Sequence, residues 1–212
     1  HGTITTSSSS LTLNARNTGI MIFQSGGTER MRIGSDGATT INVSGNEDTL
    51  TLKSTDTDAS AGPILKLSRD NNSASASDVV GKIIFTAEDG GNNLTDYAEF
   101  LTQITDASDG SESVRFIIKG MKGGNYRKLI DFNTTETIFN DESDDLDFRV
   151  ESNGNANMLF VDGGNDHVNI GTSSDLGGVF NVSGETVMRT SGNSDTLTLK
   201  CTDADAEEGP IL

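Results

Sequence analysis

The chain has 212 residues, of which 33% are hydrophobic, and it contains no tryptophan. Its 15 basic and 32 acidic residues give a net charge of −17, which excludes phosphate-rich partners such as nucleic acid and anionic membrane surfaces. No apolar run approaches the roughly 18 residues of a membrane span, so we expect no membrane insertion.

Short runs in the first third of the chain alternate apolar with polar residues. In residues 29–33 (ERMRI) the two apolar side chains point one way and the two arginines the other, as in a half-buried strand. The dipeptide Asp36-Gly37 predicts a hairpin turn, because both residues tolerate positive φ. The strands predicted here are 11–14, 20–24, 29–33, 39–43, 49–53 and 64–68.

The middle of the chain carries its most apolar run, residues 79–87. The apolar residues of 97–105 fit a helical or a strand spacing, and we choose a strand because every neighbouring element is one. Turns are predicted at Asp89-Gly90 and Asp109-Gly110, with a longer connection over 120–125. The strands predicted here are 79–87, 97–105, 113–119, 126–132 and 136–139.

The last third returns to short alternating runs, separated by Asn153-Gly154 and Gly163-Gly164. No segment has the length, periodicity and caps of a convincing helix. Many short strands with turn dipeptides between them predict an all-β fold without substantial helix. The strands predicted here are 144–151, 158–162, a further strand after Gly163-Gly164, and then 179–182, 186–189 and 196–200.

Three blocks of this chain occur twice in the same order. Residues 21–34 match 158–171 without a gap, and the tetrapeptide NVSG occurs at 42–45 and 181–184. Residues 48–65 match 195–212 at 14 of 18 positions. Self-similarity of this kind indicates a repeat-built protein. We therefore predict a first repeat block at 1–62, a central β module at 63–140, and a second block at 141–212 that is cut inside the next module of a longer polypeptide.

The composition predicts that one copy cannot complete a core. Thirty-three per cent hydrophobic residues is low for a globular domain, yet these residues are patterned, which argues against disorder. Short strands that are polar on one face would leave unpaired edges in water. We therefore expect several copies to interleave as an intertwined fibre of β-hairpin or β-sandwich modules, as a homotrimer.

We predict no catalytic, cofactor-binding or metal site, and no cofactor. Residues 141–147 resemble the start of an EF-hand calcium-binding loop, but Leu146 stands at the position where that loop needs glycine. Gly163-Gly164-Asn165-Asp166 is interpreted as a turn, not as a calcium repeat. Asp56 and Asp58, repeated as Asp203 and Asp205, are interpreted as a solvated loop, with shared calcium at a trimer axis as the alternative.

Two single residues also favour structural roles. His167 corresponds to Arg30 of the first block and is expected on an outer face. Cys201 corresponds to Ser54, so that position needs only a small residue and not a reactive thiol.

Basic and acidic residues are segregated between 113 and 151. Five basic residues and no acid lie in 113–130, whereas seven acids and one arginine lie in 136–151. We interpret this as mutual neutralisation between neighbouring strands or chains. The alternative is that the basic face, with Lys119 and Lys122, contacts an anionic host-surface glycan.

The repeated elements resemble those of a known family. Residues 26–37 (GGTERMRIGSDG) and 158–172 (MLFVDGGNDHVNIGT) look like β-hairpin repeats of bacteriophage tail fibres and tailspikes, especially of marine phages. The stretch from Ile64 through 79–100 to 106–116 resembles a module of those fibres, whose markers here are Gly81, Ile83, Phe85, Tyr97, Ala98 and Asp109-Gly110. The loop 70–77 departs from the family pattern.

This resemblance implies a trimer of intertwined β-structure in the virion tail. We expect a structural segment, not an enzyme: a rigid spacer that links the virion to a host-receptor-binding tip. Its expected partners are further copies of itself, other virion tail proteins and a host cell-surface glycan. The alternatives are a polysaccharide-depolymerising tailspike segment and a calcium-stiffened bacterial surface adhesin.

Overall fold

The computed structural model describes residues 3–6, 11–15, 19–60 and 62–187. These residues form fourteen β-strands and no helix, which confirms the all-β fold class. The chain divides into two compact units, His1–Lys66 and Leu67–Leu212, and each is described by itself. The predicted strands 186–189 and 196–200, with Cys201, Asp203 and Asp205, lie wholly or mostly outside the described residues.

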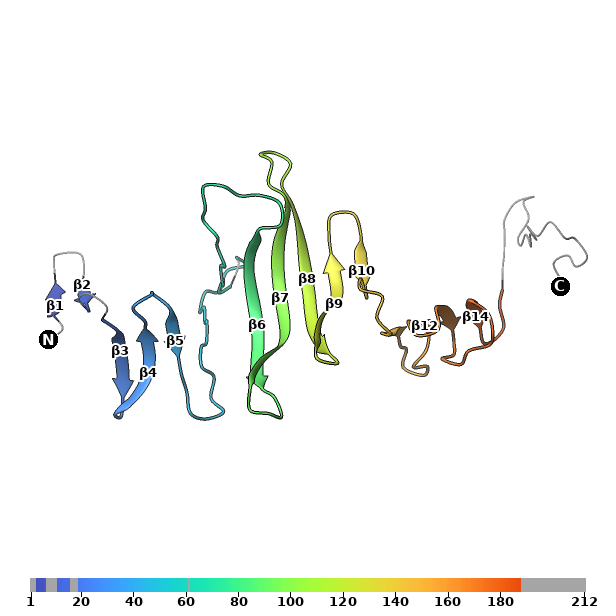
Figure 1. The fold of residues 1–212 in the computed structure, drawn as a ribbon, viewed down its shortest axis with the longest axis horizontal. Helices are drawn as coiled ribbons and strands as arrows, with labels where there is room; N and C mark the ends of the chain where they lie inside the picture. Colours follow the sequence, from blue (N-terminus) through green and yellow to red (C-terminus); the bar gives the residue numbers. More distant parts are fainter. Residues whose placement is uncertain (1–2, 7–10, 16–18, 61, 188–212) are drawn as a thin grey trace, which may run out of the picture. The chain divides into compact units, whose positions relative to one another are not determined.

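The first unit contains two small antiparallel sheets (Figure 1). One is a two-stranded hairpin, and the other is a meander in which the Asp36-Gly37 turn joins the last two strands. Gly37 has φ +85°, which confirms the predicted turn. The strands are β1 (Thr3–Thr6), β2 (Leu11–Asn14), β3 (Met21–Ser25), β4 (Thr28–Ile33) and β5 (Thr39–Ile41).

The predicted strands 49–53 and 64–68 are wrong for this chain. The described residues between 42 and 78 contain no strand, although their leucines alternate with polar residues. Leu50 is 61% exposed and Leu65 is 62% exposed. Alternation indicates that one side of a segment is apolar, but a strand forms only when a neighbouring backbone supplies hydrogen bonds, and none does so among the described residues.

The second unit is built around a five-stranded antiparallel sheet in the order β10-β9-β8-β7-β6 (Figure 1). The ambiguous stretch 97–105 lies in its longest strand, which confirms the strand prediction. Residues 120–122 were predicted as a connection but continue β8, and only Gly123 and Gly124 form the turn. The strands are β6 (Val79–Glu88), β7 (Leu94–Asp106), β8 (Ser113–Lys122), β9 (Asn125–Phe132) and β10 (Thr137–Phe139).

The same unit carries a four-stranded sheet in the order β11-β12-β13-β14. Its first three strands are antiparallel, whereas β14 runs parallel to β13, with Asn169 opposite Asn181. The strands are β11 (Phe148–Val150), β12 (Leu159–Asp162), β13 (His167–Ile170) and β14 (Phe180–Val182). The described part of the chain contains no helix that could cross a membrane.

The two repeat blocks therefore share a sequence pattern but differ in topology. In the first block, β5 returns antiparallel to β4 after a short turn. In the second, nine residues connect the paired strands, and β14 lies parallel to β13. Between the matched glycine and the NVSG tetrapeptide, the second block is two residues longer than the first. The longer connection thus accompanies the change from an antiparallel to a parallel partner.

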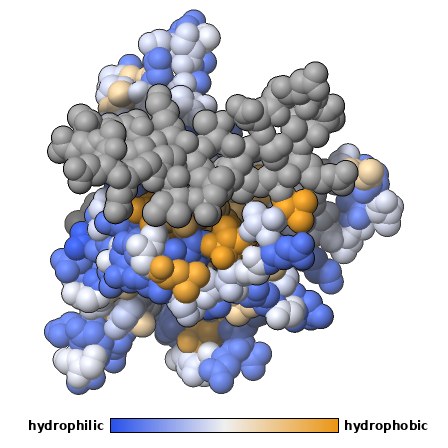
Figure 2. Space-filling view, turned by 90° about the vertical axis from the view of Figure 1, so that its right-hand side faces the viewer, coloured by the Kyte–Doolittle hydropathy of each residue, from blue (hydrophilic) through white to orange (hydrophobic). Residues whose placement is uncertain are grey.

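The described residues bury few apolar side chains. Only Leu101, Ile117 and Phe160 among their hydrophobic residues are fully buried, while many large hydrophobic residues are exposed. Figure 2 shows orange hydrophobic surface reaching the exterior between blue hydrophilic side chains. The expectation of a thin core in one copy is thus confirmed, and whether other copies complete it stays a prediction.

Candidate functional site: an open apolar sheet face

One face of the five-stranded sheet carries a row of phenylalanines that crosses four strands. Phe85, Phe100, Phe116 and Phe132 come from β6, β7, β8 and β9 in turn. Ring centroids lie 5.7 Å apart for the first pair and 6.2 Å apart for each of the next two. These distances are within the range of favourable aromatic contacts, so the row is continuous across the sheet.

Aliphatic residues extend this surface. The strand register places Ile83 opposite Phe100, and Phe100 opposite Ile118. Together with the four phenylalanines, these two isoleucines are called the phenylalanine face below. Phe85 is 50% exposed and Phe132 is 40% exposed. A contiguous apolar surface of this kind on a chain is a mark of an interaction site.

On the opposite side of the sheet, charged residues of neighbouring strands pair with one another. Glu99 is 4% exposed, and its carboxylate lies 2.8 Å from Lys82 Nζ and 3.4 Å from Lys119 Nζ. Asp131 is 2% exposed and lies 2.5 Å from an Arg115 Nη atom. These five residues are called the ionic face below.

The ionic face covers a small hydrophobic centre. Leu101 and Ile117 lie between its charged residues in the strand register and are each only 3% exposed. Long basic side chains lay their apolar stems over such residues while keeping their charged heads in water. A hollow of about 270 Å³ remains there, lined also by Tyr126 and Lys128. Burial, with the nearby carboxylates of Glu99 and Asp96, raises the pKa of Tyr126, so this residue stays a neutral phenol.

The segregated charges seen in the sequence meet in the structure. Arg127 lies 3.3 Å from Glu142 and 3.2 Å from Asp144, and Lys128 pairs with Asp141. Lys122 donates a hydrogen bond to the backbone carbonyl of Asp145. Arg127 and Lys128 of β9 are thus neutralised within the chain by the acidic stretch, as the first interpretation predicted for neighbouring segments. Contact of Lys119 and Lys122 with a host glycan stays a prediction.

An apolar hollow of about 400 Å³ lies where the two sheets of the second unit meet. Leu129 and Phe139 line it from the five-stranded sheet, and Phe148 and Val161 line it from the other. The rings of Phe139 and Phe148 lie 4.7 Å apart.

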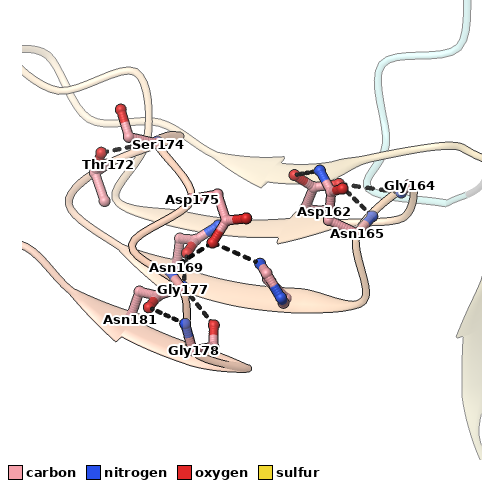
Figure 3. Close-up of polar contacts among 11 residues, drawn as sticks. Asp162, Gly164, Asn165, Asn169, Thr172, Ser174, Asp175, Gly177, Gly178 and Asn181 are labelled. Carbon is pink, nitrogen blue, oxygen red and sulfur yellow. Dashed lines mark hydrogen bonds and ion pairs between the residues drawn. The ribbon is translucent and has the colours of Figure 1, made fainter.

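The turn at Gly163-Gly164-Asn165-Asp166 is a structural turn, as predicted (Figure 3). Asp162 accepts hydrogen bonds from the backbone of Gly164 and Asn165 and from the Asn165 side chain. The side-chain bond is the largest cause of the lowered pKa of Asp162. Its carboxylate oxygens are engaged in closing the turn.

Beside this turn, the side chains of Asn169 and Asn181 are joined by a hydrogen bond across the parallel strands β13 and β14 (Figure 3). Asn181 Nδ2 donates to Asn169 Oδ1 at 2.7 Å and to the Gly178 carbonyl at 2.7 Å. Asn169 is completely buried. Buried amides in register on parallel strands hold two strands in one alignment, so this pair has a structural role that sequence reasoning missed.

The remaining residues singled out in the sequence are not gathered into one site. His167 is 17% exposed and its Nδ1 lies 3.2 Å from Asp175, so it is more buried than the outer-face residue we predicted. Asp56 and Asp58 lie in an exposed loop, where each carboxylate accepts a hydrogen bond from the backbone N–H two residues later. Among the described residues, no group of three or more His, Cys, Asp or Glu side chains could hold a metal ion.

No protein-family model matches this chain, and no curated protein matches it in sequence. The resemblance to tail fibres therefore stays a prediction. The open phenylalanine face is the strongest candidate for a functional surface.

Proposed function

We propose that this chain is a structural segment of a phage tail fibre or spike, a rigid homotrimeric spacer between the virion and a receptor-binding tip. The observation that supports the proposal best is the contrast between the two sides of the five-stranded sheet. The ionic face covers its own hydrophobic centre, whereas the phenylalanine face leaves aromatic rings 39% to 50% exposed at Phe85, Phe116 and Phe132.

The exposed part of the phenylalanine face favours association but is not sufficient for it. Four of its side chains, Ile83, Phe85, Phe116 and Phe132, are 39% to 50% exposed and offer roughly 350 Å² of surface. At about 25 cal/mol per Å², covering this surface is worth roughly 9 kcal/mol per copy. Association costs on the order of 4–15 kcal/mol, so the free energy gained by covering this face is about as large as that cost. Further contacts between copies are therefore needed for a stable fibre.

The mass of the particle in solution tests the proposal. Light scattering of the purified chain is expected to give three chains per particle. Phe116→Ser is expected to shift the particle toward single chains, because it removes an aromatic ring from the middle of the row. Ile84→Ser is the matched control, since Ile84 is 44% exposed but lies on the opposite side of the sheet. A wild-type particle of one chain would contradict the proposal.

A second measurement addresses the place in the virion. Antibodies raised against the purified segment are expected to label the tail fibres of particles whose genome encodes it, as seen by electron microscopy. Labelling of host cells without virions would instead favour a bacterial surface protein.

A further inference from the structure

The connection between β11 and β12 carries the only Asn-Gly pair in the sequence, Asn153-Gly154. Both residues are exposed. Among the described residues, neither the Asn153 side chain nor the Gly154 N–H has a hydrogen-bond partner. An added Cβ at Gly154 would meet nothing within 4 Å. The side-chain amide of Asn153 and the backbone nitrogen that follows it are therefore free to approach one another in water.

Other asparagines of the same unit are held or hindered. Asn165 has its side-chain nitrogen engaged with the Asp162 carboxylate at 3.1 Å. Asn72 is exposed, but Ser73 follows it, and a side chain at that position crowds the backbone nitrogen next to the asparagine. Asn153 combines exposure, an unengaged side chain and a following glycine, and no other asparagine of the sequence has all three.

We propose that Asn153 is a modification site, which deamidates spontaneously in the folded protein through a succinimide. The Gly154 nitrogen gives its proton to solvent and attacks Cγ of Asn153, the bond from Cγ to the side-chain nitrogen breaks, and ammonia leaves with a proton from solvent. Water then opens the five-membered ring at either carbonyl. One opening gives aspartate, and the other gives isoaspartate, in which the main chain runs through the side-chain methylene. One water is consumed, and no oxidant or cofactor is needed.

The isoaspartate form disturbs the four-stranded sheet beside it. Ser152 and Asn155 flank the pair and are joined by two hydrogen bonds. The Ser152 N–H donates to the Asn155 carbonyl at 2.8 Å, and the Asn155 N–H donates to Ser152 Oγ at 3.1 Å. Asn155 Nδ2 in turn donates to the carbonyl of Gly171, directly after β13, at 3.4 Å. An additional main-chain atom between Ser152 and Asn155 changes the spacing that these bonds need, so the end of β13 loosens.

Peptide mass spectrometry of the purified chain, incubated in mildly alkaline buffer, tests whether the fold permits the reaction. The rate at Asn153 in the native protein is expected to lie within fivefold of the rate in the urea-unfolded chain. It is also expected to be at least tenfold faster than the rate at Asn72 in the same native sample. A native rate more than fivefold below the unfolded rate would show that the fold protects Asn153, and would overturn the inference.

Gly154→Ala tests the route through the succinimide. The added methyl group meets nothing in the folded chain, but it crowds the attacking nitrogen. The variant is expected to keep the unfolding midpoint of the wild type and to slow deamidation at Asn153 at least tenfold. An unchanged rate would show that water hydrolyses the side-chain amide directly, and would overturn the proposed route.

Hydrogen exchange of the separated products tests the effect on the sheet. Amides of residues 168–170 are expected to exchange at least tenfold faster in the isoaspartate form than in the unmodified protein. Freshly prepared Asn153→Asp is the control, because it adds the charge without the extra main-chain atom, and its exchange is expected to change less than twofold. Equal exchange in the two forms would overturn the proposed effect. None of these measurements depends on the proposed trimer.

Discussion

At Gly163 the turn between β12 and β13 passes so close to the backbone of Leu146 that no side chain fits. An added Cβ would lie 2.6 Å from the Leu146 carbonyl oxygen and 2.9 Å from its amide nitrogen. Backbone atoms cannot rotate away as a flexible side chain can. The contact therefore determines the residue at this position more strongly than the turn does.

Gly163→Ala is expected to destabilise the protein by about 1–3 kcal/mol, the usual cost of overpacking. Gly154→Ala is the matched control, because an added Cβ there meets nothing within 4 Å. Denaturant unfolding measures both. Equal stability of the two variants would show that the backbone near Leu146 yields without cost.

The sequence predicted a turn at Gly163 but not the reason for glycine. The dipeptide Gly163-Gly164 is a local turn signal, whereas the close approach of Leu146 is a tertiary contact. Sequence reasoning missed Glu99 and Asp131 for the same reason, since a carboxylate is expected in water unless its partner is known. Their lysine and arginine partners lie on neighbouring strands, so the register was needed to find them.

At the scale of single elements, the turn of the β6–β7 hairpin is held together by hydrogen bonds to one carboxylate. Asp89 accepts hydrogen bonds from the backbone N–H of Asn93 and Gly91 and from the Asn93 side chain. These bonds lower the pKa of Asp89 below its ordinary value of 3.8. The stability they provide is therefore present above that value and is lost as the pH falls through the lowered pKa.

Asp89→Asn is expected to flatten the acid side of the stability profile. The amide keeps an acceptor oxygen in the turn but cannot be protonated in this range, so less stability is lost between about pH 5 and pH 2. Thermal unfolding at a series of pH values measures the slope. Asp109→Asn, in the β7–β8 turn, is the control. It removes the same charge, but the Asp109 carboxylate accepts no hydrogen bond found among the described residues. An identical slope in Asp89→Asn and wild type would contradict the assignment.

Strand positions in the five-stranded sheet were well predicted, because long alternating runs bounded by Asp-Gly turns leave few alternatives. Strand partners and directions were not. Residues 49–53 have the alternation of a strand but lack a neighbour among the described strands, and the strands beside the two NVSG tetrapeptides, β5 and β14, run in opposite directions relative to their partners. Alternation describes the two sides of a strand and carries no information about what lies at its edges.

On the scale of the whole chain, a net charge of −17 opposes the association that the phenylalanine face favours. Every copy added to an oligomer brings the same negative charge, so the copies repel one another. Salt screens this repulsion. The oligomer is expected to be more stable at 200 mM than at 20 mM NaCl. Sedimentation at a series of protein concentrations measures the shift.

The direction of this salt effect distinguishes two kinds of interface. An apolar interface between like-charged copies strengthens as repulsion is screened. If association instead depended on opposite charges, with the ionic face of one copy meeting an acidic loop of another, salt would weaken it. Oligomeric state itself was not predictable from single residues, because the sequence shows which faces are apolar but not what covers them.

In the two repeat blocks, strand direction and connection length differ together. Two extra residues accompany the change from an antiparallel to a parallel partner. Small insertions in a tandem array can therefore go together with a change in strand pairing while a neighbouring tetrapeptide keeps its sequence. A lineage that lengthens such a protein by duplication thus gains architectural variety from slippage in the turns alone.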